Sequence, residues 1–152
     1  MCGIVGLFLK DKTLEPKLGE MLTEMLITMT DRGPDSAGIA IYGSGAGNHA
    51  KLTIQSDNAD ADFTNLAEDL SEVINAKVTL RRNDTHAILE LPGESIEAAR
   101  EALANLRDGL RIMSAGDVIE IYKEVGLPKD VAERFDVSGM GGTHGIGHTR
   151  MA

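Results

Sequence analysis

The sequence holds little cysteine and few aromatic residues, and each scarcity narrows what the protein can be. Its single cysteine, Cys2, excludes an internal disulfide and any metal site built from several thiolates. A chain with one thiol suits a reducing compartment, so we expect a cytoplasmic protein. Tryptophan is absent and aromatic residues make up 3% of the chain, which leaves aliphatic side chains and seven methionines to build the core.

Positive charge and long apolar runs are also scarce. Lys and Arg number 15 against 24 Asp and Glu, and the net charge of −9 repels phosphate backbones and anionic lipid. No apolar run approaches the roughly 20 residues that span a bilayer, and "MCGIVGLFLKDK" lacks the basic start and cleavage site of a signal peptide. We therefore expect neither nucleic acid nor a membrane as a partner.

What the chain does contain is enough for a folded domain. With 152 residues and 42% hydrophobic content, it fits one domain, or one domain with a small insert. The short apolar run at residues 4–9 predicts a buried strand, and residues 37–43 predict a second one. Between them, apolar residues recur at helical spacing over residues 18–29, which predicts an amphipathic helix that ends before Gly33 and Pro34.

The middle of the chain predicts a self-contained module. Its expected strands cover residues 50–56, 76–82, 86–91 and 109–113, and its expected helices cover residues 62–75 and a segment that Ser95 caps. This βαββαβ order is that of a ferredoxin-like split unit. We interpret residues 50–113 as an insert in a domain formed by residues 1–49 and 114–152, with a helical stretch directly after the insert.

The position of Cys2 suggests a chemical role. Once Met1 is removed, Cys2 carries the free chain amine, whose pKa of roughly 7.7 to 8.0 suits it to take a proton from a thiol with a pKa of about 8.5. The nucleophile would then bring its own base. The alternative interpretation is a small residue that only begins a buried strand.

Three separated segments favour the chemical interpretation. The segments "MCGIVG" at the start, "DRGPDSAG" at 31–38 and "GIGHTR" at 145–150 resemble the signature of class II glutamine amidotransferases, which are amino-terminal-nucleophile hydrolases. The stretch "YKEVGLPKDVAERF" is further similar to stand-alone amidotransferase subunits of the glutamate synthase type. The resemblance covers residues 1–43 and 117–152, about half the chain, and implies an α+β fold, the αββα sandwich of that superfamily.

The resemblance also implies a reaction and a site. Cys2 would attack the side-chain amide of glutamine, form a thioester and release ammonia for a synthase subunit or domain, and water would then free glutamate. Arg150 matches the arginine that grips the substrate α-carboxylate, for which a planar bidentate donor is suited. The remaining predicted substrate-binding residues are Arg32 and Gly33, in a loop beside the nucleophile, and His148 and Thr149, which shape the pocket. This chemistry needs no cofactor or metal, and no motif indicates one.

The sequence departs from this family in two respects, of which one is the insert, since many relatives join the second and third segments by a much shorter link. The family's domain continues past the third segment and there supplies an Asn-Gly pair for the oxyanion hole and an aspartate for the substrate amine, and no motif in this chain replaces them. Loss of one oxyanion donor costs on the order of a hundredfold in rate. We therefore expect the chain alone to be nearly inactive, its sandwich to be incomplete, and a further half or a partner chain to complete it.

Two other functions stay open at this point. The protein could be a non-catalytic structural or regulatory subunit on the same scaffold, with the insert as a binding module. It could instead be a small-molecule sensor centred on residues 50–113. Retention of Met1 would favour a non-catalytic form, because an amide nitrogen cannot serve as the base.

Overall fold

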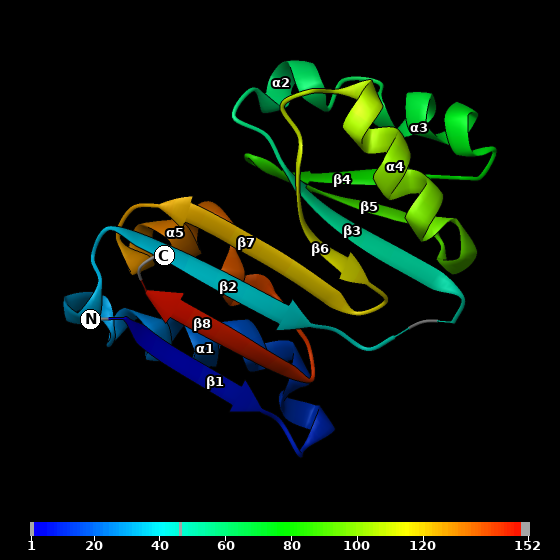
Figure 1. The fold of residues 1–152 in the computed structure, drawn as a ribbon. Helices are drawn as coiled ribbons and strands as arrows, with labels where there is room; N and C mark the ends of the chain where they lie inside the picture. Colours follow the sequence, from blue (N-terminus) through cyan, green and yellow to red (C-terminus); the bar gives the residue numbers. More distant parts are fainter. Residues whose placement is uncertain (1, 46, 150–152) are drawn as a thin grey trace. The chain divides into compact units, whose positions relative to one another are not determined.

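The computed structural model describes residues 2–45 and 47–149, and it shows an α+β protein with two four-stranded sheets (Figure 1). The chain divides into two compact units, Met1–Ser44 with Ile121–Ala152, and Gly45–Glu120. The first sheet has the strand order β1-β8-β2-β7, and the second has the order β4-β5-β3-β6. We describe each unit by itself.

The first unit holds the first sheet, except that β7 begins just before the unit boundary. Its strands are β1 (Gly3–Phe8), β2 (Ser36–Tyr42), β7 (Ile119–Val125) and β8 (His144–Thr149). Its α-helices are α1 (Leu18–Ile27) and α5 (Pro128–Arg134), and its short 3₁₀ turns are η1 (Lys12–Lys17), η2 (Thr30–Arg32) and η4 (Val137–Gly139). β8 pairs antiparallel with β1 on one side and with β2 on the other. Strands from both ends of the chain therefore lie side by side.

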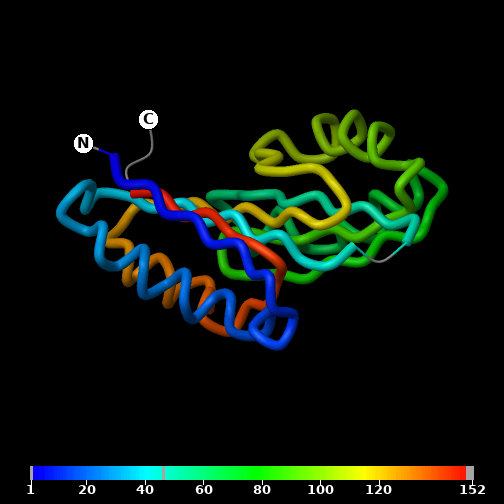
Figure 2. Tube along the Cα trace, turned by 90° about the horizontal axis from the view of Figure 1, so that it is seen from below, coloured from blue at the N-terminus to red at the C-terminus, as the bar shows by residue number. Residues whose placement is uncertain are grey.

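Helix α1 covers one face of this sheet, with α5 beside it (Figure 2). Leu18, Leu22 and Leu26 recur every fourth residue along α1 and are fully buried. Opposite them, β8 has glycine at positions 145 and 147: a Cβ atom there would lie 2.8 Å from Leu22 Cδ2 and 3.1 Å from Leu26 Cδ1, respectively. The helix thus packs directly against the backbone of β8.

The other face of β1 and β8 carries large apolar side chains that are open to solvent. Because neighbours along a strand alternate between faces, Ile146 points away from α1, and so do Ile4 and Phe8 of β1, which pair with His148 and His144. The exposed fractions of Ile4, Phe8 and Ile146 are 72%, 67% and 42%. These three side chains therefore lie outside the core of the first unit.

The second unit holds the second sheet and three helices. Its elements are β3 (His49–Gln55), α2 (Ala59–Asp62), α3 (Leu66–Ile74), β4 (Thr79–Asn83), β5 (His86–Pro92), a 3₁₀ turn (Gly93–Ser95), α4 (Ile96–Leu106) and β6 (Arg111–Gly116). In this sheet β3 pairs antiparallel with β5 and with β6, and β4 pairs antiparallel with β5. Side chains of β3 and β5 form a buried core with α3 and α4, including Leu52, Leu89, Leu70 and Leu103, which are at most 1% exposed.

The observed elements match most of the strands and helices expected from the sequence, with three differences. The helix expected at residues 62–75 begins only at Leu66, because Asn65 directly before it takes a left-handed conformation with φ 54°, and a separate short helix, α2, covers Ala59–Asp62. Ser95 occupies the N-cap position of α4, but its side chain makes no capping hydrogen bond. The stretch after residue 113, expected to be helical, first forms the end of β6 and all of β7, and only α5 is helical.

The interpretation of residues 50–113 as a ferredoxin-like insert stays a prediction, as does the αββα sandwich. Within residues 2–45 and 47–149, none of the helices has the length and hydropathy of a membrane-spanning segment.

Candidate functional site

Cys2 lies at the start of β1, where it is exposed to solvent. The next residue, Gly3, pairs with Thr149 at the end of β8. The backbone N–H of Gly3 also donates a hydrogen bond of 3.1 Å to the Thr149 Oγ1 atom, and the Thr149 side chain is fully buried. The buried hydroxyl therefore holds the backbone directly after the candidate nucleophile.

The segment "DRGPDSAG" at residues 31–38 lies at the same end of the sheet, where β1 begins. A Cβ atom on Gly3 would lie 2.9 Å from the Met29 Cβ and 3.2 Å from the Arg32 Cβ, so the turn that follows α1 lies against the start of β1. Gly33 is buried, and its N–H donates a 3.1 Å hydrogen bond to the carbonyl of Thr30. This bond closes the turn and brings the chain to β2.

The last residues of this segment, 36–38, begin strand β2, which pairs with β8 on the side opposite to β1. Ala37 pairs with Thr149 and Gly38 pairs with His148. The imidazole of His148 lies against Gly38, in the space that a side chain at that position would need. Thr149 is thus flanked in the sheet by Gly3 on one side and Ala37 on the other.

The structure therefore brings together most of the residues that the sequence singled out. Thr149 and His148 lie on β8, Arg32 and Gly33 follow α1, and all are next to the strand that Cys2 precedes. Arg150 and Met1 lie outside the described residues. The roles of these side chains remain predictions.

Two residues that the sequence did not assign to the site complete this arrangement. Gly3 and Gly38 allow the close approaches described above, because no larger residue at position 3 or 38 would leave room for its neighbours. The signal for both was present in the motifs, since a glycine follows both Cys2 and Ala37.

The two histidines of β8 do not form a metal site. His144 and His148 share a face of the strand, but residues four apart on a strand are separated by about 13 Å, too far to bind one ion. His144 instead stacks on Tyr42, with ring centroids 4.1 Å apart and an interplanar angle of 12°. Across the described part of the chain, no group of three His, Cys, Asp or Glu side chains is arranged to hold a metal.

Comparison with known proteins adds two relatives. The chain is 60% identical over 153 residues to the glutamine amidotransferase-like protein GlxB of Rhizobium meliloti, and 32% identical over 161 residues to a protein named as a putative glutamine amidotransferase from Methanothermobacter thermautotrophicus. Both alignments cover all of this chain but only 50% and 52% of the relatives, so the chain spans about half the length of the curated relatives it matches. No family model matches the chain. Over its whole length the chain is thus similar to parts of two proteins that are named as glutamine amidotransferases or as glutamine amidotransferase-like.

Proposed function

We propose that this chain forms the nucleophile-bearing part of a class II glutamine amidotransferase, in which Cys2 hydrolyses glutamine and the ammonia passes to a synthase partner of the glutamate synthase kind. One observation supports this most directly: Gly3, Thr149 and Ala37, from three distant motifs, are neighbours across three adjacent strands. Such convergence suits a site that is assembled at the end of a sheet. The names of the two relatives support the same reaction class.

In the proposed reaction, removal of Met1 frees the amine of Cys2. The amine accepts the thiol proton, and the sulfur attacks the side-chain carbonyl carbon of glutamine. The tetrahedral intermediate expels the amide nitrogen, which takes the proton from the amine and leaves as ammonia. Water, deprotonated by the same amine, then cleaves the thioester, and the thiol and glutamate are released.

The neighbouring residues take supporting roles in this proposal. The bond from Gly3 to Thr149 fixes the backbone beside the nucleophile, and the turn containing Arg32 and Gly33 borders the same position. Arg150 would bind the α-carboxylate of glutamine as a bidentate donor. The oxyanion donors and the group that binds the substrate amine would come from a further half or from a partner chain, so the chain alone should be nearly inactive.

Mass spectrometry of the native protein tests the proposal. We expect a protein without Met1, and we expect a chloroketone analogue of glutamine to form one adduct, at Cys2. L-glutamine should slow this labelling, and D-glutamine should not. Because Cys2 is exposed and is the chain's one cysteine, iodoacetamide without glutamine provides a matched control that should label it whether or not a glutamine pocket exists.

Two outcomes would contradict the proposal. Retention of Met1 would leave Cys2 without its base, and labelling by the analogue that L-glutamine does not slow would mean that no glutamine pocket exists. Either result, with iodoacetamide reacting normally, would favour a non-catalytic subunit.

A further inference from the structure

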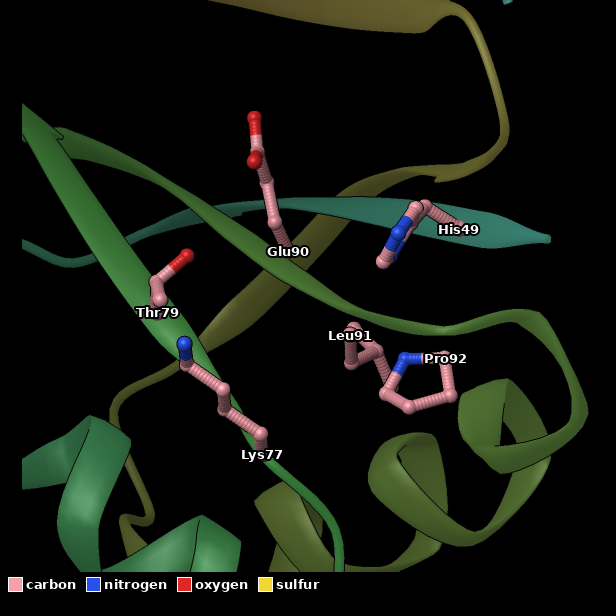
Figure 3. Close-up of a pocket in the computed structure, with 6 residues that line it drawn as sticks. All are labelled: His49, Lys77, Thr79, Glu90, Leu91 and Pro92. Carbon is pink, nitrogen blue, oxygen red and sulfur yellow. The ribbon is translucent and has the colours of Figure 1, made fainter. Parts of the chain in front are cut away.

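A pocket of about 190 Å³ lies in the second unit, whereas the residues assigned to the glutaminase reaction belong to the first unit. Its lining residues are His49, Lys77, Thr79, Glu90, Leu91 and Pro92, shown in Figure 3. Three strands contribute to it: the start of β3, the start of β4 with the residues before it, and the end of β5.

The pocket lies on the face of the sheet opposite to α3 and α4. Leu89 and Leu91 of β5 point into the core beneath these helices, so Glu90 between them points to the other face. Glu90 pairs with Thr79 of β4, which places the Thr79 side chain on the same face. Antiparallel pairing thus holds a carboxylate and a hydroxyl side by side.

The charged groups of the pocket are available to a ligand. Glu90 and Lys77 are both exposed, and within the described residues neither has an ion pair or a side-chain hydrogen bond. The lysine nearest to Glu90 by register is Lys51 of β3, but its ammonium binds Glu120 at 2.8 Å. Glu120 also binds Arg81, at 2.9 Å. The cations beside the pocket therefore neutralise Glu120 and leave Glu90 without a partner.

The size and charge of the pocket define the ligand class. Sites for drug-sized molecules occupy about 300 to 1,000 Å³, so a pocket of about 190 Å³ suits a smaller molecule. One ammonium and one carboxylate favour a ligand that carries both charges, and Glu90 would repel a polyanion such as a nucleotide. Pro92, on the same face as Glu90, supplies apolar surface for a short aliphatic side chain.

We propose that this pocket binds a free α-amino acid with a small side chain. Lys77 and Thr79 donate hydrogen bonds to the α-carboxylate, and Glu90 accepts them from the ammonium group. Figure 3 shows the ammonium of Lys77 and the hydroxyl of Thr79 on one side of the pocket and His49 on the other. Charge-assisted hydrogen bonds at both ends of the ligand select the zwitterion over molecules with a single charge.

Titration of the ¹⁵N-labelled full chain with L-alanine, followed by NMR, tests this inference. We expect saturable shifts of the backbone amides of Thr79, Glu90 and Leu91. Lys77→Gln and Glu90→Gln should each weaken binding by about tenfold or more, because each removes one charge-assisted contact. L-alaninamide, which lacks the carboxylate, and N-acetyl-L-alanine, which lacks the ammonium, should bind similarly less well.

Matched controls separate the pocket from general charge effects and from the glutaminase site. Lys10→Gln and Glu72→Gln remove exposed charges elsewhere and should change affinity by less than roughly twofold. Cys2→Ala should bind alanine as the parent does, so failure of the proposed glutaminase function leaves this result unchanged. The inference is wrong if about 10 mM alanine shifts none of the three amides, if both analogues bind as tightly as alanine, or if both pocket variants bind normally.

Discussion

Replacing Thr149 by valine tests whether its hydroxyl organises the start of β1. Valine keeps the shape of threonine but cannot accept the 3.1 Å hydrogen bond from the Gly3 N–H. Thr149 is fully buried, so water cannot replace the lost acceptor. A buried donor left without a partner costs about 1 to 3 kcal/mol, and we expect Thr149→Val to lower the free energy of unfolding by this amount.

Urea unfolding of the parent and two variants measures the effect. Thr149→Ser keeps the acceptor and removes one methyl group, whose burial is worth about 0.8 kcal/mol, so it should be destabilised less than Thr149→Val. The rate at which iodoacetamide labels Cys2 gives a second, local measurement, which should change in the valine variant only. If Thr149→Val is as stable as the parent, or if serine is the more destabilising replacement, packing of the methyl group matters and the hydrogen bond does not.

Two further predictions concern the second unit. Leu103→Ala removes a core side chain that is 1% exposed, and urea unfolding should show that it lowers the free energy of unfolding by about 2 to 5 kcal/mol. The control Val73→Ala, at a position that is 60% exposed, should change the free energy of unfolding by less than about 0.5 kcal/mol. Equal effects of the two substitutions would contradict the described core. Hydrogen bonds and charge from Arg111 lower the pKa of Asp57 from its usual 3.8, so the stability that this pair adds is present above that value and is lost as the pH falls through the lowered pKa. In Arg111→Gln, carboxyl NMR titration should find the pKa of Asp57 raised toward 3.8 and that of Asp11 unchanged.

Local sequence pattern was sufficient to predict elements whose burial follows a simple period. Helix α1 was predicted because its leucines recur on one face, and that face is the buried one. Strand β7 was missed because Glu120, Lys123 and Glu124 favour a helix locally, whereas pairing with β2 in the sheet decides the conformation. The break between α2 and α3 depends on the left-handed Asn65, which periodicity does not reveal.

The candidate site could be predicted only in part. Gly3 and Thr149 are 146 residues apart, and no periodicity or composition relates them; the motifs did so through their resemblance to a family. Neither the hydrogen bond between them nor the contact of His148 with Gly38 follows from the motifs, because both depend on the register of β8 against its neighbours. The motifs therefore predicted which residues belong to the candidate site, but the contacts among these residues depend on how the strands pair.

The glycines of β8 have a consequence for how this strand can vary among homologous proteins. On the side facing α1, a methyl group at position 145 or 147 would crowd the side chains of Leu22 and Leu26, so a substitution there requires these leucines to shift. On the opposite side, Ile146 is 42% exposed and can be exchanged with little cost to this unit. Evolutionary freedom along the strand should therefore alternate residue by residue.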